Sequence, residues 1–319
     1  MADKRDAAVS SQNRSGGIDL LRFIGILLMI MGHVGFGGVF AKYIHAFHMP
    51  LWFFITGIFA KTDRPFGDVL KKRVKTLLIP YLFFSIVYEI LWTLLGNNRW
   101  MGLLYPNSVQ IPINGAIWFL PAMFFVSMIG FCLLKYLPKY VSYPLFVLLA
   151  VLGSLNLVSL PLSLDSALVG LGFFFIGYLL KQYAEKAYHL PLWFSLPLLA
   201  VGSALVFLNG TVNMRKNEYA IIPLFWLSAV CIIPALLSLC HQVDKKVNLK
   251  ICKEIGAQSI IYVCTNEFII KAFQVVLPSS LPQPVMIVLN LFITAATIAI
   301  GFWMNRLILK TPLKFLLGK

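Results

Sequence analysis

Residues 17–33 read GIDLLRFIGILLMIMGH, an apolar run whose ionisable residues are Asp19, Arg22 and His33. A run of this length predicts a membrane-spanning helix, because a helix satisfies its own backbone hydrogen bonds where a bilayer offers no partners. The rest of the chain is similar: 59 % of its 319 residues are hydrophobic, 12 % are charged, and the mean hydropathy is +0.83. This charged fraction is about half that of an ordinary soluble domain. We therefore expect an all-α, polytopic integral membrane helix bundle.

Further apolar runs, separated by short polar segments, divide the chain into about ten predicted membrane spans of roughly 20 residues each. The polar residues 1–17 are expected to form a cytoplasmic tail, because they lack the apolar core and cleavage-site pattern of a signal peptide. Residues 18–319 would then form one membrane-embedded domain. The predicted spans are 18–40, 44–61, 76–96, 115–136, 141–158, 164–181, 191–209, 219–241, 255–277 and 284–308.

The positions of the basic residues predict how these spans are oriented. The net charge of +15 does not indicate nucleic-acid binding, because Lys and Arg gather in the short segments between apolar runs. If the N-terminus is cytoplasmic, the outer segments hold only Lys42, Arg99, Arg215 and Lys216. The positive-inside rule then favours two cytoplasmic termini and an even number of spans. The longest outer segment, 97–114, is expected to lie on the membrane surface or to fold over a site.

Several common functional signatures are missing from the sequence. The five cysteines form no CxxC pair and fall in predicted spans or on the predicted cytoplasmic side, so we expect free thiols. There is no Walker loop, no GxGxxG after a strand and no GxSxG elbow. The sequence therefore does not support ATP-driven transport. It also does not support a hydrolase that uses a GxSxG serine.

The first predicted span carries a polar stripe. Eleven positions separate Arg22 from His33, which is three turns plus about 20°, so both lie on one face with Asp19 nearby. The rise between Arg22 and His33 is about 16 Å. Ionisable residues inside a span are functional candidates by default, and this pair suits an elongated ligand with an anionic head and a reactive tail, such as a coenzyme A thioester. Alternatively, Arg22 snorkels to lipid headgroups and a backbone carbonyl satisfies His33.

Two more histidines open the second predicted span, in the stretch HAFHMPLWFFITG at 45–57. This span returns from the outer side, so we expect His48 at about the depth of His33. Two imidazoles at one depth suggest a base and an orienting partner. A metal site is the alternative, but no carboxylate or thiolate follows at ligand spacing, and we expect no metal.

Two carboxylates and one basic segment complete the set of candidates. Glu89 in the third span and Glu267 in the ninth are expected at a depth similar to that of His33. Glu267 also stands four residues before Lys271, a spacing that favours an ion pair within one helix. The basic segment 61–75 is expected to set the topology and contact lipid headgroups, with a share that could attract ligand phosphates.

These residues resemble the signature of the acyltransferase 3 family of membrane proteins. The family carries arginine or lysine, ten residues and then histidine on its first span, often after an acidic residue, and Arg22, His33 and Asp19 match this pattern. The stretch FHMPLWFFITG at 47–57 resembles the second-span motif and places His48.

Later stretches extend the resemblance along the chain. KKRVKTLLIPY at 71–81 resembles the basic motif before the third span, through Arg73 and Lys75, and AIWFLPAMF at 116–124 resembles a later motif. In GAQSIIYVCTNEF at 256–268 the chain departs from the family, because Thr265 or Asn266 stands where a histidine is expected.

The resemblance implies a function and a set of site residues. The nearest branch is similar to fucose O-acetylases, which implies acyl-coenzyme A, most simply acetyl-coenzyme A, as donor. It implies a sugar hydroxyl of an envelope or exported glycan, free or lipid-linked, as acceptor, in a bacterial plasma membrane. His33 would be a general base or a transient acyl carrier. The candidates are His33, His48 and Glu267 for catalysis, and Arg22, Asp19, Arg73 and Lys75 for the donor.

A proton-coupled transporter or flippase is the alternative interpretation. Buried arginine, histidine and glutamate in a helix bundle are also typical of such carriers. Paired broken helices or repeated halves would favour it, and the sequence has neither.

Overall fold

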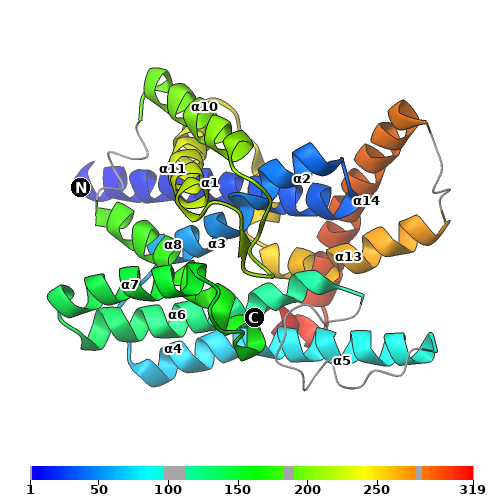
Figure 1. Cartoon of the computed structure of the whole chain (residues 1–319), viewed down its shortest axis with the longest axis horizontal. Coiled ribbons are helices and arrows are strands. Elements are labelled where there is room, and N and C mark those ends of the chain that lie inside the picture. Colours follow the sequence, from blue (N-terminus) through cyan, green and yellow to red (C-terminus); the bar gives the residue numbers. More distant parts are fainter. Residues whose placement is uncertain (1, 97–112, 183–189, 277–281, 319) are drawn as a thin grey trace.

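The helices of this protein run in several directions through one bundle (Figure 1). The computed structural model describes residues 2–96, 113–182, 190–276 and 282–318. The described strands are β1 (Val212–Asn213) and β2 (Glu218–Tyr219), which pair antiparallel in a small hairpin. The rest is helix and connecting turns, so the predicted all-α class is confirmed.

The helical elements make up most of the described residues. In chain order they are α1 (Ala2–Val34), α2 (Gly38–His45), α3 (His48–Ile58), α4 (Phe66–Arg73), the π-helical turn η1 (Val74–Leu78), α5 (Ile79–Leu94), the 3₁₀ turn η4 (Gly115–Trp118), α6 (Phe119–Tyr136), α7 (Lys139–Ser154), the 3₁₀ turn η5 (Pro161–Ser163), α8 (Leu164–Gln182), α10 (Leu192–Leu208), α11 (Ile222–Lys246), α12 (Lys250–Gly256), α13 (Ser259–Val276), α14 (Gln283–Leu309) and the 3₁₀ turn η6 (Pro312–Leu317).

Seven helical segments within the described residues are long and apolar enough to cross a membrane. The shorter helices α7 and α10 are also apolar, and helical structure occupies part of every predicted span. A membrane helix bundle is thus confirmed, whereas the count of ten spans and the cytoplasmic termini stay predictions. The seven segments are Gly16–Val34, Phe66–Leu94, Gly115–Tyr136, Pro161–Lys181, Ile222–Lys246, Ser259–Val276 and Gln283–Leu309.

α1 differs from the predicted first span, 18–40, at both ends. It begins at Ala2, within the predicted tail, and it ends at Val34. The helix stops there because Gly35 and Gly37 have φ angles of 96° and 102°, which residues with a side chain rarely adopt. His33 therefore lies in the last turn of α1, just before the chain reverses.

The second predicted span, 44–61, is wrong in extent. α2 continues through His45, the chain turns, and α3 then runs for only 11 residues from His48. A helix of this length is about 16 Å long, roughly half the thickness of a bilayer's hydrocarbon core. It is nevertheless buried along almost its whole length, because it lies inside the bundle against α8.

The backbones of α3 and α8 touch where both carry glycine. A Cβ on Gly57 would collide with the carbonyl of Phe174, and a Cβ on Gly177 would collide with the carbonyl of Phe54. Small residues allow membrane helices to approach this closely, which increases their van der Waals contact. The packing fixes α3, and with it His48, against the rest of the bundle.

The basic segment 61–75, which the sequence predicts as a loop between two spans, is helical from Phe66 onward. α4 continues through η1 into α5, so that one helical segment extends from Phe66 to Leu94. The π turn precedes Pro80, which has no N–H to donate to the carbonyl of Thr76 and so interrupts the regular pattern of hydrogen bonds. Such turns insert an extra residue and often occur at functional sites.

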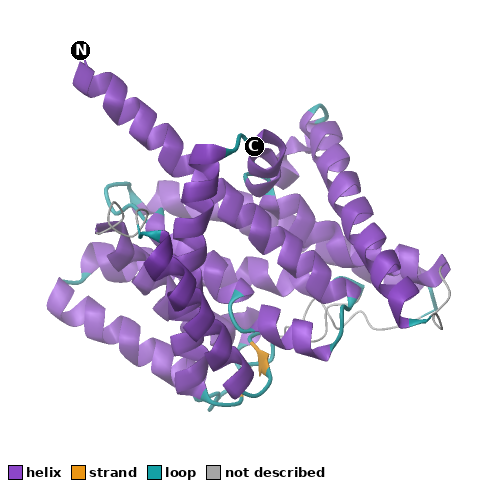
Figure 2. Ribbon diagram, turned by 90° about the horizontal axis from the view of Figure 1, so that it is seen from above, coloured by secondary structure: helices purple, strands orange, loops and turns teal. Residues whose placement is uncertain are grey.

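α1 is surrounded by helices from the end of the chain, since it packs against α11, α12, α13 and α14. Its N-terminal turns project away from the bundle, and the strands lie toward the opposite edge (Figure 2). The predicted outer loop at 97–114 falls, up to residue 112, outside the described residues.

Candidate functional site

Two cavities lie along α1 and share a wall. Trp52 of α3, Phe119 of α6 and Val263 of α13 line both of them. Arg22 lines one cavity, of about 260 Å³, and His33 lines the other, of about 250 Å³. The two ends of the predicted polar stripe thus line two neighbouring cavities, and three apolar side chains form the wall between them.

The cavity at Arg22 is called the basic cavity, because Arg22, Lys72 and Arg73 line it. Arg22 donates a hydrogen bond of 2.8 Å to Asp19, and its guanidinium lies 5.0 Å from the ring centre of Phe59. The bond to Asp19 uses one of five N–H donors and holds the guanidinium in place. The cavity is therefore suited to an anion, and Arg22 is half-buried within the bundle.

Residues of η1 and of the break between α12 and α13 also line the basic cavity. Thr76 lines it and donates a hydrogen bond of 2.9 Å to the carbonyl of Lys72. Gly256 lines it from the other side, where α12 packs directly on α1: a Cβ on Gly256 would collide with the carbonyl of Asp19. A glycine is needed at this crossing for steric reasons.

The residues predicted to bind the donor fall into three groups. Arg22 and Arg73 both line the basic cavity, whereas Asp19 is the carboxylate that holds Arg22. Lys75 is exposed and does not line this cavity. Lys72 also lines this cavity. The sequence did not indicate this, because a segment predicted as a loop has no helical face from which its lining residues could be chosen.

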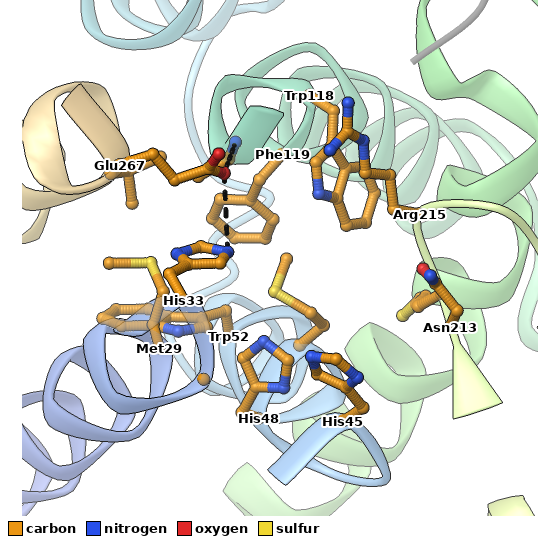
Figure 3. Close-up of a pocket in the computed structure, with 15 residues that line it drawn as sticks. Met29, His33, His45, His48, Trp52, Trp118, Phe119, Asn213, Arg215 and Glu267 are labelled. Carbon is orange, nitrogen blue, oxygen red and sulfur yellow. Dashed lines mark hydrogen bonds and ion pairs between the residues drawn. The ribbon is translucent and has the colours of Figure 1, made fainter. Parts of the chain in front are cut away.

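The cavity at His33 is called the histidine cavity, because His33, His45 and His48 line it (Figure 3). The Nδ1 atom of His33 lies 2.6 Å from the Oδ1 atom of Asn266. Its Nε2 atom lies 3.5 Å from the Oε1 atom of Glu267. The imidazole of His33 is thus held between an amide and a carboxylate, both from α13.

Glu267 connects three elements of this cavity. Its Oε1 atom accepts a hydrogen bond of 2.8 Å from the backbone N–H of Ala116 in η4. Its Oε2 atom lies 3.6 Å from the ammonium of Lys271, which confirms the ion pair predicted within this helix. The carboxylate is 15 % exposed and lies beside the imidazole of His33, so it can stabilise a positive charge there.

His48 does not orient His33, contrary to one of the sequence-based hypotheses. The partner of the Nδ1 atom of His33 is Asn266, and the Nδ1 atom of His48 is 2.9 Å from the carbonyl oxygen of Ile44. The rings of His45 and His48 lie 5.5 Å apart at one side of the cavity (Figure 3). Both histidines line the same cavity as His33.

Arg215 is a cavity residue that the sequence did not reveal. It lies in the turn of the β1–β2 hairpin, which brings both Arg215 and Asn213 to the histidine cavity. Burial lowers the pKa of the Arg215 guanidinium, and the nearby Glu267 carboxylate opposes this shift. The sequence distinguished Arg215 in only one respect: it is one of the few basic residues on the predicted outer side.

One further sequence candidate lies away from both cavities. Glu89 is buried on α5 but lines neither cavity. Within the described part of the chain, no group of three or more His, Cys, Asp or Glu residues is placed to hold a metal ion. The ionisable and amide groups that line the histidine cavity are imidazole, carboxylate, carboxamide and guanidinium.

Comparison with known proteins identifies one family. The model of the acyltransferase 3 family, described as an acyltransferase domain, matches residues 15–306 and so includes both cavities. The comparisons with curated proteins and with solved structures found no match.

Proposed function

The chain belongs to the acyltransferase 3 family of membrane acyltransferases, and on this premise we propose that it transfers an acyl group from acyl-coenzyme A to a sugar hydroxyl. The acyl group would be acetyl, and the acceptor a free or lipid-linked saccharide of a bacterial envelope. The observation that carries the proposal is the shared wall between a basic cavity and a cavity that holds His33 and Glu267.

The donor would bind with its phosphates in the basic cavity. Arginine suits phosphate because it is always charged and presents its N–H groups as a planar fork. Arg22 and Arg73 would contact the phosphates, and Lys72 would add a further positive charge. The pantetheine arm would then pass the shared wall, so that the thioester reaches His33.

The acceptor would enter the histidine cavity beside the β1–β2 hairpin. The Nε2 atom of His33 would take the hydroxyl proton while the hydroxyl oxygen attacks the thioester carbonyl. The new C–O bond forms and the C–S bond breaks, and the leaving thiolate takes the proton from the imidazolium to give coenzyme A. Glu267 would stabilise the imidazolium during this step, as its position 3.5 Å from Nε2 allows.

A second route uses the same residues in two steps. The Nε2 atom of His33 would attack the thioester itself, release coenzyme A and carry the acyl group until the sugar hydroxyl takes it. The two routes differ in whether label from the donor is ever bound to the protein.

Turnover by the purified protein tests the proposed function. Protein in detergent micelles, which cannot hold a gradient, would be mixed with radiolabelled acetyl-coenzyme A and glycan extracted from the bacterial envelope. We expect release of free thiol and a mass increase of one acetyl unit on the glycan, and neither with the His33→Ala variant. Absence of both products with any envelope glycan or acyl-coenzyme A would contradict the proposal.

A further inference from the structure

Asn266 is fully buried, and its side-chain amide can take only one orientation. Its Nδ2 atom donates hydrogen bonds to the carbonyl of Tyr262 at 2.7 Å and to the carbonyl of Val263 at 3.2 Å. If the amide were turned around, its oxygen would face two other oxygen acceptors with no donor between them. The Oδ1 atom of Asn266 is therefore the one that faces His33, 2.6 Å from its Nδ1 atom.

This orientation determines where the proton of His33 lies. An amide oxygen can only accept a hydrogen bond, so the Nδ1 atom of His33 must carry the proton that is donated to Asn266. A neutral imidazole has one N–H, which leaves Nε2 without a proton. Nε2 faces the Oε1 atom of Glu267 at 3.5 Å (Figure 3), which is longer than an ordinary N–H···O hydrogen bond, so the contact of 2.6 Å with Asn266 is the one that holds the proton of the neutral ring.

We propose that Asn266 is a positioning residue, which holds His33 in the Nδ1–H tautomer so that its Nε2 atom is the base or nucleophile. The proposal rests on the proposed function, in which His33 acts on the acceptor or the donor. The hydrogen bond at one ring nitrogen selects the tautomer, and without it either nitrogen can carry the proton.

Asn266 is itself held by a hydrogen-bonded frame around the first half of α13. Asn114, which is also fully buried, donates to the carbonyls of Val263 and Cys264, and the hydroxyl of Tyr88 donates to the carbonyl of Cys264 at 2.6 Å. Inside a membrane bundle such buried polar side chains satisfy themselves on backbone carbonyls and thereby fix the helix position. The frame holds the turn of α13 that precedes Asn266.

A direct measurement of the tautomer tests the proposal independently of any acyl transfer. Protein labelled with ¹⁵N-histidine would be studied by NMR in detergent, and the signals of His33 would be assigned by their loss in the His33→Gln variant. We expect neutral His33 in the wild-type protein to carry its proton on Nδ1, and this preference to be lost in Asn266→Leu. A wild-type His33 with its proton on Nε2 would overturn the proposal, whether or not the protein is an acyltransferase.

Kinetics provide the second measurement. Asn266→Leu should lower kcat by about 10²-fold or more, with the KM for the donor within about twofold, because only the protonation pattern of the base changes. Asn266→Asp keeps an acceptor opposite Nδ1, but its second oxygen can replace the Nδ2 donor to the carbonyls of Tyr262 and Val263 only when it is protonated, so the neutral acid should recover part of the rate. The kcat/KM of this variant should therefore fall as the pH rises through the pKa of the new carboxyl group, in contrast to the wild-type profile.

A neighbouring residue, Thr265, supplies the control variant. Thr265 donates to the carbonyl of Ile261 at 2.7 Å, so Thr265→Val removes one polar group from the same turn without touching His33. It should retain activity within about twofold. Equal kcat values for Asn266→Leu and Thr265→Val would contradict the role of Asn266. The pH profile also reflects the other charged and titratable groups near His33, which are His45, His48, Arg215, Glu267 and Lys271.

Discussion

Arg22 and His33 lie on the same face of α1 but line two different cavities, with Trp52, Phe119 and Val263 between them. A ligand that contacts both residues must therefore extend along the shared wall. Changes at the two ends of such a ligand affect different kinetic parameters: those at Arg22 should alter binding, and those at His33 should alter chemistry. This separation is the basis of the first predictions.

Replacing His33 should abolish most of the chemistry and leave binding intact. A positioned general base typically contributes about 10²–10⁴-fold in rate, so His33→Ala should lower kcat by that factor. Donor affinity, measured by fluorescence or calorimetry on the purified variant, should stay within about twofold, because His33 lies in the other cavity. A folded His33→Ala variant with wild-type turnover would remove His33 from the mechanism.

The same residue also distinguishes the two chemical routes. If His33 carries the acyl group, rapid quenching of the wild-type protein with denaturant near neutral pH, where an acyl-imidazole is most stable, should leave label from the donor on this residue. If His33 acts only as a base, the protein should stay unlabelled. His48→Ala serves as the comparison and should reduce kcat less, because His48 contacts the backbone of Ile44 rather than His33.

Arg22→Ala should weaken binding of the donor. The loss of a charge-assisted hydrogen bond is worth about 1.5–3 kcal/mol, so we expect the donor Kd to rise by roughly 10- to 100-fold. Arg22→Lys should restore only part of the affinity, because an ammonium lacks the planar fork of N–H donors. An unchanged Kd in a folded Arg22→Ala variant would mean that Arg22 serves the lipid headgroups.

Arg73 and Lys75 offer a matched pair two residues apart. Arg73 lines the basic cavity, whereas Lys75 is exposed outside it. Arg73→Ala should therefore raise the donor KM about tenfold, and Lys75→Ala should leave it within about twofold. Equal effects of the two substitutions would indicate a general electrostatic attraction rather than a specific contact.

The sequence predicted the stripe on α1 correctly, but not the identity of every basic residue in the cavity. The stripe follows from helix geometry alone, since residues eleven positions apart return to the same face. This rule could not be applied to the segment before the third span, because that segment was not predicted to be a helix. Its helical face, and hence the choice of Lys72 over Lys75, depends on the π turn η1, which the sequence did not indicate.

The residues that contact His33 could not be predicted from the sequence around it, for a different reason. Asn266 and Glu267 are more than two hundred residues away in the chain, and α13 comes beside α1 only through the packing of the bundle. Counting depths suggested Glu267 and His48 as neighbours of His33, and both line its cavity. It could not indicate which of them touches the imidazole, because depth says nothing about the direction in which a helix faces.

Membrane topology is a separate prediction, based on the uneven distribution of basic residues. In a cysteine-free background, Lys216→Cys in the β1–β2 hairpin should react with an impermeant thiol reagent in intact cells. Asp68→Cys in α4 should react only after the membrane is permeabilised, because α4 is expected on the cytoplasmic side. Both positions are exposed, so burial does not limit their reactivity. The opposite labelling pattern would reverse the orientation and place the basic cavity outside.

The contact between Gly115 and Arg215 allows the role of the hairpin to be measured. A Cβ on Gly115 would collide with the guanidinium of Arg215, which is the end of a flexible side chain and can move away without unfolding the bundle. Gly115→Ala should therefore displace Arg215 within the histidine cavity, and kcat/KM for the acceptor should fall. The measurement is a double-mutant cycle with Arg215→Ala.

If Gly115→Ala acts through Arg215, it should have little further effect once Arg215 is alanine. We expect a coupling between the two positions of about 0.5–3 kcal/mol, the range seen for residues in contact. Additive effects would mean that the added methyl group disturbs η4 itself, where the neighbouring Ala116 N–H donates to Glu267. The KM for the donor should stay constant throughout, because neither residue lines the basic cavity.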